Sequence, residues 1–565
     1  MAMMQPTASR RPFLTLAAAC LAAAAAGGAA PPGQPAPLPR LEKRGEAIQL
    51  VVDGAPFLVL GGELGNSAGE PDYLRPRWTH LQSLNLNTVL APVYWDLTEP
   101  EEGRFDFATV DGLVRDARAH GMRLVLLWFA SWKNSMSCYA PAWVKTDTRR
   151  FPRARDSEGR SLDILSPVAA SNREADARAF SALMRHLRET DGDRHTVIMV
   201  QVENEIGMIP EARDRSAAAN DLFAKPVPAA LLDYLGHQSA PTTPGLRDLR
   251  PAERQRAAGS WEQVFGPGRA TEELFTAWHF ASYAGAVASA GKAEYALPMF
   301  VNAALIRPGY LPGQYPSGGP LPHLFEVWRA AAPSIDFLTP DIYFANFAEW
   351  ARRYARPGNP LFVPEAQRTG EASVRAFYAI GQLNAIGFSP FGIESIAGSA
   401  AAWLGEAYRL LAGLAPTILA HQGRGTMAGL LPEGPEQRQP LELSLGDYIM
   451  RVSYEQQVPP ALADGAVAAT GGAVPASLPP GGLVIATGRD EFLFAGAGLT
   501  VTFASARSGD RVGLLNVEEV GFDSGRPTHV RWLNGDETHQ GRHVRLEPGR
   551  FSVQRVRLYR YRDLT

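Results

Sequence analysis

The stretch His195-Thr-Val-Ile-Met-Val-Gln-Val-Glu-Asn-Glu-Ile-Gly207 is the most informative part of the 565-residue chain. Its run of Val, Ile and Met predicts a buried strand over 197–202. That strand leads directly into Glu203, Asn204 and Glu205. In α/β barrels, polar side chains at the C-terminal ends of the buried strands form the functional site. The stretch therefore predicts a parallel sheet with a polar site at one edge.

Seven other short apolar segments have the same character, and helical patterns separate several of them. A helical face over 110–117 ends before Gly121, and Ser171 and Glu174 fit a capping box for a second helix. Strands that alternate with helices favour the α/β class, with a closed (β/α)₈ TIM barrel over 45–428 rather than an open sheet. The seven segments are 57–60, 88–94, 123–129, 298–302, 337–343, 360–363 and 385–388.

The sequence pattern changes after about residue 430, where helical periodicity fades and Gly/Pro-rich turns separate β-rich runs. We expect a C-terminal, all-β, sandwich-like domain over 429–565. Asn534-Gly535 is a hairpin turn signal between a strand at 529–533 and a later one. The other expected strands are 483–486, 499–503, 512–517 and 553–559.

The N-terminus is typical of a secretory signal, expected over 1–30, followed by a Pro-rich leader over 31–44. Arg10 and Arg11 precede an apolar run that is short for a membrane span, and no later stretch reaches about 18 uninterrupted apolar residues. We therefore expect a periplasmic or secreted protein without a transmembrane segment. Cys20 lies within the signal, and lipidation there is the alternative.

Bulk charge excludes some functions. Lys and Arg total 55 against 58 Asp and Glu, without long single-sign blocks, so nucleic-acid binding is not expected. No His/Cys motif for zinc and no Gly-rich nucleotide motif in a strand-to-helix context occurs, so we expect neither a metal nor an organic cofactor.

A second strand also ends on a carboxylate, in Pro360-Leu-Phe-Val-Pro-Glu-Ala-Gln-Arg368. For a single glutamate, a surface or ion-pair role is the simpler explanation. Glu205 and Glu365 at equivalent strand ends instead indicate one site. Two carboxyl groups about 5 to 5.5 Å apart are what glycoside hydrolysis with retention requires.

The chain resembles the glycoside hydrolase family 35 β-galactosidases over about 45–425. The resemblance rests on Gln201-Val-Glu-Asn-Glu205, and on the stretch Asn85-Leu-Asn-Thr-Val-Leu-Ala-Pro-Val-Tyr-Trp-Asp-Leu-Thr-Glu-Pro100 followed by Gly103-Arg-Phe-Asp-Phe107. It implies that Glu205 is the acid/base and Glu365 the nucleophile. It also implies that Asn204 binds the 2-hydroxyl of the sugar and that Tyr343 orients the nucleophile. Such roles require a raised pKa for Glu205 and an ionised Glu365.

Two positions depart from common family members, which have a sugar-contacting Tyr and Glu where this chain has Pro92 and Ser131. The stretch Trp128-Phe-Ala-Ser-Trp-Lys-Asn-Ser-Met-Ser-Cys-Tyr139 instead resembles a bacterial branch with its own C-terminal β domain. That branch implies galactosyl side chains on plant polysaccharides such as xyloglucan as substrates.

Several further residues are candidates for substrate binding. Trp95 and Trp132 are expected to stack on sugar rings, as are Trp128 and Trp143, although about half of such residues serve the core instead. Lys133 and Asn134 are expected to bind hydroxyls; a solvated loop charge is an equally good account of Lys133. Glu394 is a reserve nucleophile, for which substrate binding or an ion pair is the favoured role.

These observations predict a retaining exo-β-galactosidase acting on terminal β-galactosyl residues of oligosaccharides or polysaccharide side chains. The alternatives are a retaining glycosidase or transglycosylase of different sugar specificity and a non-catalytic carbohydrate-binding protein. Capping the barrel is the simplest role for the β domain, and subunit contacts or polymer binding are the others. The oligomeric state does not follow from the sequence.

Overall fold

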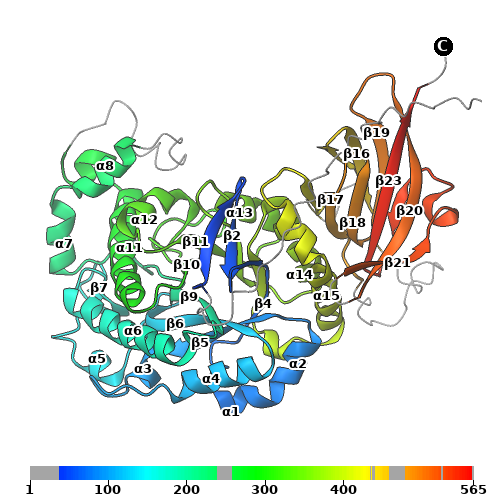
Figure 1. Cartoon of the computed structure of the whole chain (residues 1–565). Helices are drawn as coiled ribbons and strands as arrows, with labels where there is room; N and C mark the ends of the chain where they lie inside the picture. The colour runs from blue at the N-terminus through cyan, green and yellow to red at the C-terminus, as the bar shows by residue number, and fades with distance from the viewer. Residues whose placement is uncertain are drawn as a thin grey trace, which may run out of the picture. The chain divides into compact units, whose positions relative to one another are not determined.

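A computed structural model of the chain describes residues 37–237, 258–432, 434, 439–456, 477–523 and 526–562. The expected signal segment, which includes Cys20, and residues 31–36 of the leader lie outside these residues. The described part contains a closed barrel and, after it, two larger antiparallel sheets (Figure 1). In this part of the chain, no helix combines the length and the apolar composition that spanning a bilayer requires.

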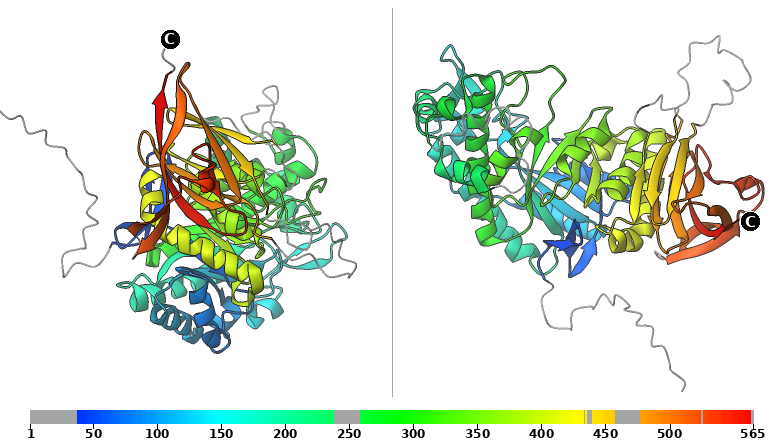
Figure 2. Two further views of the ribbon diagram at one scale, coloured as in Figure 1. Left: turned by 90° about the vertical axis from the view of Figure 1, so that its right-hand side faces the viewer. Right: turned by 90° about the horizontal axis from the view of Figure 1, so that it is seen from above.

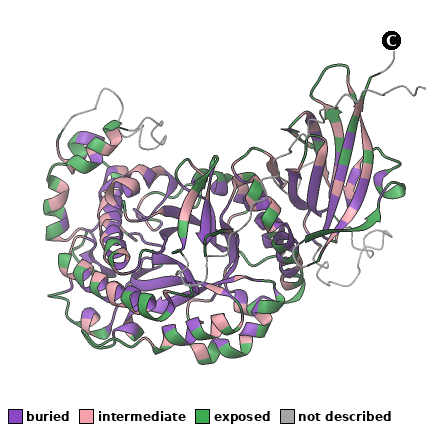
Figure 3. Cartoon of the chain, in the orientation of Figure 1, coloured by how far each residue is buried: buried purple, intermediate pink, exposed green. Residues whose placement is uncertain are grey.

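Eight parallel strands form the barrel, and β13 pairs with β4 to close it. The strands are β4 (Val59–Glu63), β5 (Thr88–Tyr94), β6 (Arg123–Lys133), β9 (Val197–Asn204), β10 (Met299–Ala304), β11 (Phe337–Ile342), β12 (Phe362–Ala366) and β13 (Gly387–Pro390). They are buried along most of their length, whereas the outer faces of the helices are exposed (Figure 3). The predicted (β/α)₈ barrel is confirmed, and each predicted strand overlaps an observed one.

The barrel helices bury one apolar face each. The helices and 3₁₀ turns of this region are α1 (Pro71–Leu74), η1 (Arg75–Arg77), α2 (Trp78–Ser83), α3 (Trp95–Thr98), α4 (Ala108–Ala119), α5 (Ala142–Thr146), α6 (Ala170–Asp191), α7 (Ala217–Ala224), α8 (Ala229–His237), α10 (Trp261–Phe265), α11 (Arg269–Glu294), η3 (Pro322–Leu324), α12 (Phe325–Ala331), α13 (Phe347–Tyr354), α14 (Glu371–Leu383), η4 (Ile393–Ser395) and α15 (Gly398–His421). The predicted capping box is wrong, because α6 starts two residues earlier than it requires. Its N-cap is Ala169, and the Ser171 hydroxyl instead bonds the carbonyl of Arg150.

The N-terminal end of the barrel is apolar and is closed by a small sheet of β1 (Arg40–Arg44), β2 (Ala47–Val52) and β3 (Ala55–Phe57). Leu50 of β2 belongs to one buried cluster with Phe300, Phe337 and Phe362 of three neighbouring barrel strands. The rings of Phe300 and Phe337 stack with their centroids 5.2 Å apart. A short two-stranded sheet, β7 (Arg153–Arg155) and β8 (Ser161–Leu165), lies in the insertion between β6 and β9.

The C-terminal region is all-β, as predicted. Its six-stranded sheet runs β14 (Met427–Leu430), β17 (Gly481–Ala486), β18 (Glu491–Ala497), β23 (Ser552–Tyr561), β20 (Arg511–Asp523) and β21 (Arg526–Trp532), drawn from gold to red in Figures 1 and 2. The four-stranded sheet runs β15 (Leu441–Leu445), β16 (Tyr448–Tyr454), β19 (Leu499–Ser505) and β22 (Val544–Leu546). One buried cluster draws residues from both sheets. The boundary expected at 428 falls inside β14.

The hairpin expected at Asn534-Gly535 is wrong. The pair follows β21 and leads into the 3₁₀ turn η5 (Asp536–Thr538), and the next strand, β22, pairs with β19 of the other sheet. A turn signal in the sequence does not specify which sheet receives the following strand.

The barrel and the six-stranded sheet share one apolar core. Helix α14 packs against β14 and β17, and a Cβ added at Gly381 would lie 2.8 Å from the Cβ of Leu483. The ring of Phe377 on α14 contacts that of Phe551, with centroids 5.6 Å apart. This contact agrees with the simplest of the expected roles for the β domain, which is to cap the barrel.

Candidate active site

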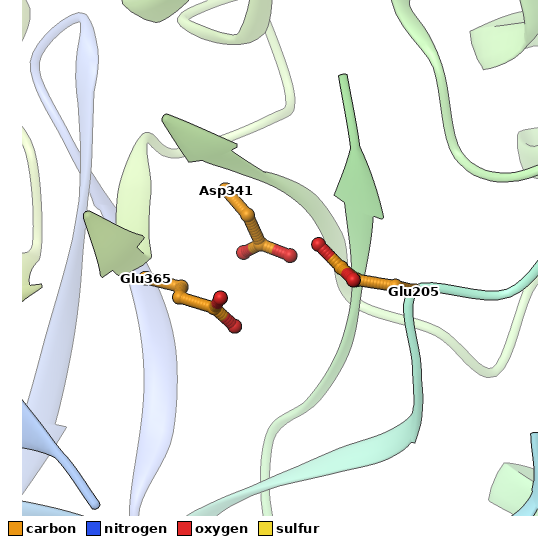
Figure 4. A group of neighbouring side chains, drawn as sticks. All are labelled: Glu205, Asp341 and Glu365. Carbon is orange, nitrogen blue, oxygen red and sulfur yellow. The ribbon is translucent and has the colours of Figure 1, made fainter. Parts of the chain in front are cut away.

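Three carboxylates meet beyond the C-terminal ends of the barrel strands. Glu205 directly follows β9, Asp341 lies on β11 and Glu365 on β12. All three are buried, and each offers an oxygen within 4.8 Å of the others. Their carboxylates face one another in Figure 4. The structure therefore brings together the two predicted glutamates, and it adds an aspartate between them.

A fourth acid, Glu63, ends β4 and is 2% exposed. Burial raises the pKa of Glu63 well above its usual range, and the negative charge of Glu365 raises it further. Burial and the charges of Glu365 and Glu205 act in the same direction on the pKa of Asp341. Burial therefore raises the pKa of both accessory acids.

Glu365 is held by Tyr343, whose hydroxyl donates a hydrogen bond to Oε1. Its other oxygen, Oε2, is buried and has no hydrogen-bond partner among the described residues. Burial raises the pKa of Glu365 to about 7, and the charge of Glu205 contributes, while Lys133 and Tyr343 oppose the shift. This shift runs against the requirement for an ionised Glu365, because burial outweighs the hydrogen bond from Tyr343 and the charge of Lys133. Tyr343 itself has a raised pKa and remains a donor.

Glu205 is positioned by its backbone and by a side-chain amide. The residue has a left-handed backbone with φ 44°. Its N–H donates to Oδ1 of Asn302 at 3.0 Å, and the amide of Asn302 donates to Asp341 at 2.7 Å. The Asn134 amide donates to the Glu205 carboxylate. Asn302 therefore links the predicted acid/base to Asp341.

Asn204 and Lys133 complete this side of the site. The Lys133 ammonium donates to Asn204 Oδ1 at 2.9 Å and to Asn134 Oδ1 at 2.5 Å. Lys133 is only 5% exposed, so it is not a solvated loop charge. The Asn204 amide nitrogen is buried without a partner among the described residues. An unpaired buried donor is costly, and a ligand hydroxyl would satisfy it.

Two predicted stacking platforms are corrected by the structure. Trp95 is fully buried, and its indole N–H donates to Glu99 at 2.9 Å. Trp132 is also fully buried, packs edge-on against Phe280 and Tyr283, and donates to the carbonyl of Leu165 at 3.2 Å. Neither ring presents a face to a sugar, because each closes the core beneath a loop.

Glu394, the reserve nucleophile, is not one of the three clustered carboxylates. It lies in η4 after β13, and its carboxylate accepts the N–H of Gly65 at 3.1 Å, which ties two loops together. The acids that do reach the cluster region, Asp341 and Glu63, were not singled out from the sequence. Both end apolar strands, in Thr339-Pro-Asp-Ile-Tyr343 and Val59-Leu-Gly-Gly-Glu63, and that signal was sufficient to find them.

A closed (β/α)₈ barrel with two buried, closely spaced carboxylates after its fourth and seventh strands is the architecture of a barrel glycosidase. Neighbouring hydrogen-bond donors and two further buried acids surround the pair. The arrangement can donate a proton from one carboxyl and attack an electrophilic carbon with the other.

Comparisons with known proteins point the same way. The glycoside hydrolase family 42 profile, described as β-galactosidase, matches residues 70–227, and a domain of unknown function, DUF5597, matches 404–545. A β-galactosidase of Xanthomonas manihotis is 30% identical over 228 residues, which are 38% of this chain and 35% of that protein. The β-galactosidase-1-like protein 3 of Homo sapiens is 28% identical over 160 residues, 28% of this chain and 23% of that protein.

Among solved structures, the β-galactosidase of the psychrophilic Marinomonas ef1 is 13% identical, with a TM-score of 0.45, over 64% of this chain and 60% of that one. This chain spans about a third of the length of the Xanthomonas manihotis β-galactosidase and about a quarter of the length of the Homo sapiens protein. The similarity is to β-galactosidases, and family 35 in particular is not confirmed. The profile match includes Glu205 and ends before Glu365.

Proposed function

We propose that this protein is a retaining exo-β-galactosidase of the family 35 type, with Glu205 as acid/base and Glu365 as nucleophile. The observation that carries the proposal is the distance of 4.8 Å or less between oxygens of the two buried carboxylates. Retaining glycosidases hold their carboxyl groups about 5 to 5.5 Å apart, whereas inverting enzymes leave about 6.5 to 9.5 Å for a water molecule.

In the first step, the Glu205 carboxyl donates its proton to the glycosidic oxygen while a Glu365 oxygen attacks the anomeric carbon. The bond to the leaving sugar breaks and a glycosyl ester forms on Glu365. In the second step, Glu205 takes a proton from water, whose oxygen attacks the same carbon and releases Glu365. The unpartnered Oε2 of Glu365 is the oxygen free to attack, because Tyr343 bonds the other.

Neighbouring groups support these steps. The unpaired amide of Asn204 suits a sugar hydroxyl, as the family resemblance implies for the 2-hydroxyl. Lys133 lowers the pKa of Glu365, and burial raises the pKa of the neighbouring Glu63 and Asp341, so these two acids hold a proton more readily than exposed carboxyls do. Ser131, in contrast, is buried against Asp176 and contributes no sugar contact.

The substrate class follows from the resemblance: terminal β-galactosyl residues on oligosaccharides or on polysaccharide side chains such as those of xyloglucan. The secretory signal supports a periplasmic or secreted location, and a lipid anchor at Cys20 is the alternative. Transfer to a second sugar instead of water, or a different sugar specificity, remains compatible with the same carboxylate pair.

The test compares wild type, Glu205→Ala and Glu365→Gly on an aryl β-galactoside and its gluco and fuco analogues, with azide rescue. We expect a preference for the galactoside, β-glycosyl azide from Glu205→Ala and α-glycosyl azide from Glu365→Gly. Full activity in both variants would refute the assigned roles. Cleavage only within polymers would refute the exo character, and saturable sugar binding without turnover would favour the non-catalytic alternative.

A further inference from the structure

Strand β6 breaks its pairing with β9 just before the site. Trp128 pairs with Val202, and the next pair is Lys133 with Asn204. Four residues of β6 therefore lie opposite one residue of β9, Glu203, and β6 bulges. A bulge removes backbone acceptors from the ladder, so the N–H groups of the bulged residues need other partners.

The Glu203 side chain supplies one such partner. It is fully buried, and its carboxylate accepts the backbone N–H of Trp132 at 2.7 Å. Glu203 itself has a left-handed backbone with φ 61°. A non-glycine residue persists in that conformation only where the surrounding structure holds it. The carboxylate thus replaces a strand acceptor inside the bulge.

A second buried acid, Asp176 of α6, lies behind Glu203. It accepts hydrogen bonds from the Trp128 indole at 2.9 Å and the Ser131 hydroxyl at 2.6 Å. The Tyr283 hydroxyl donates to it at 3.3 Å. Burial and then the negative charge of Asp176 raise the pKa of Glu203 well above its usual range. Asp176 thus gathers three donors behind the bulge, next to Glu203.

The residues that follow the bulge reach the site. Lys133 bonds Asn204, and the Asn134 side chain bonds Glu205. The backbone N–H groups of Asn134 and Ser135 also donate to the carbonyls of Asn204 and Glu205, each at 3.2 Å. A shift of the bulge would move all four contacts together.

We propose that Glu203 and Asp176 form a buried acid pair that fixes the bulge of β6 and so positions Lys133 and Asn134 against Asn204 and Glu205. Both acids are positioning residues that touch no substrate. The proposal rests on the proposed function for its kinetic consequence. Its structural content, the anchoring of the Trp132 N–H by Glu203, stands on its own.

The experiment compares Glu203→Gln with Glu203→Leu. Gln can still accept the Trp132 N–H and donate to Asp176, whereas Leu has a similar volume and can do neither. Each variant is assayed on galactosides with a good leaving group, which needs little acid catalysis, and with a poor one, which needs a proton from Glu205. Asn134→Ala is the matched control, because it removes the contact to Glu205 directly.

We expect Glu203→Leu to lower kcat/KM about 10²-fold for the substrate with the poor leaving group. For the substrate with the good leaving group the loss should be about ten times smaller, because a misplaced Glu205 mainly impairs proton donation. Asn134→Ala should show the same asymmetry, and Glu203→Gln should stay within about threefold of wild type. Equal losses on both substrates, or a Gln variant as impaired as the Leu variant, would overturn the proposal. Ser131→Ala, which removes one bond to Asp176, gives a weaker form of the same asymmetry if Glu203→Leu does not fold.

Amide hydrogen exchange separates this proposal from the proposed function. The Trp132 N–H should lose protection in the Leu variant and keep it in the Gln variant, whether or not the protein cleaves galactosides. An inactive wild type with this exchange pattern would refute the proposed activity and leave the acid pair intact. Unchanged Trp132 protection in a folded Leu variant would refute the acid pair.

Discussion

The two ends of the barrel interior are built from the same strands and have opposite chemistry. At the N-terminal end, Phe300 and Phe337 stack in an apolar cluster closed by the small sheet β1–β3. Two residues beyond Phe300 along β10 lies Asn302, and four beyond Phe337 along β11 lies Asp341. Side chains an even number of residues apart share one face of a strand, so each strand begins apolar and ends polar on the same face.

The contrast has an energetic meaning. Burying the phenylalanine rings stabilises the fold by about 1.5 to 3 kcal/mol each. Burying Glu63, Asp341 and Glu365 instead raises the pKa of each, which is the signature of a desolvated carboxyl. One end therefore holds the barrel together, and the other gives up stability for a reactive site.

The largest effect should come from Glu365→Gln. We expect kcat/KM to fall on the order of 10⁴-fold or more, because the amide cannot attack the anomeric carbon. The melting temperature should not fall, since the change removes a buried ionisable group. Kinetics and calorimetry on the same preparation measure both quantities. A variant that loses activity and stability together would show that the two ends are not independent.

Phe337→Ala is the converse change. Loss of the ring from the closed end should lower the free energy of unfolding by about 3 to 5 kcal/mol. The kcat/KM of the folded fraction should change by less than about threefold, because Asp341 lies four residues farther along the same face of β11. Denaturant titration measures the first quantity. Phe337→Leu, which keeps most of the volume, is the control and should cost much less.

The free energy of unfolding should fall as the pH rises from the pKa of Glu365 in the unfolded chain to its pKa in the folded protein. Its pKa is about 7 in the folded protein, against 4.5 for an unburied glutamate. The folded state therefore binds more protons between these values, and this group alone lowers the free energy of unfolding by up to about 3 kcal/mol on going from below pH 4.5 to above pH 7. Urea titrations at pH 5 and pH 8 test this. Glu365→Gln should flatten the dependence, and an unchanged slope in that variant would contradict the assignment.

Tyr343→Phe should have the smallest effect. Wild-type kcat/KM should decline below about pH 7 as Glu365 takes up its proton. Without the Tyr343 hydroxyl, the pKa of Glu365 rises further and this acid limb moves to higher pH. The expected loss at pH 7 is about three- to tenfold, with a smaller loss at pH 8. An acid limb that stays in place would mean that the Tyr343 bond does not act on Glu365.

Much of this arrangement follows from local patterns in the sequence. Apolar strands that run into polar residues predicted the eight-stranded barrel, and they predicted that Glu205, Glu365 and Asn204 would meet. These features depend on the apolar character of each strand and on the common direction of parallel strands. Short segments of the sequence are enough to indicate both. Lys133 and Asn134 also reached the site, although the bulge that brings them there was not predicted.

Two of the failures, at Trp132 and at Asn534-Gly535, share a non-local cause. Trp132 was expected to stack on a sugar ring, but the bulge of β6 turns it into the core against Tyr283. Burial of this kind depends on register between distant strands, which no local pattern encodes. Asn534-Gly535 was a good turn signal, but the strand after it joins the other sheet. Asp341 was missed for a different reason, since its position at a strand end was visible in the sequence.

The core shared by α14 and the six-stranded sheet has a consequence for how the molecule can be divided. Because Gly381 lies against Leu483 and Phe377 against Phe551, the C-terminal region covers apolar residues of α14. The two regions should melt in a single cooperative transition. A chain cut near residue 428 would divide β14, remove β17 and expose an apolar face of α14, so we do not expect the barrel to fold stably on its own.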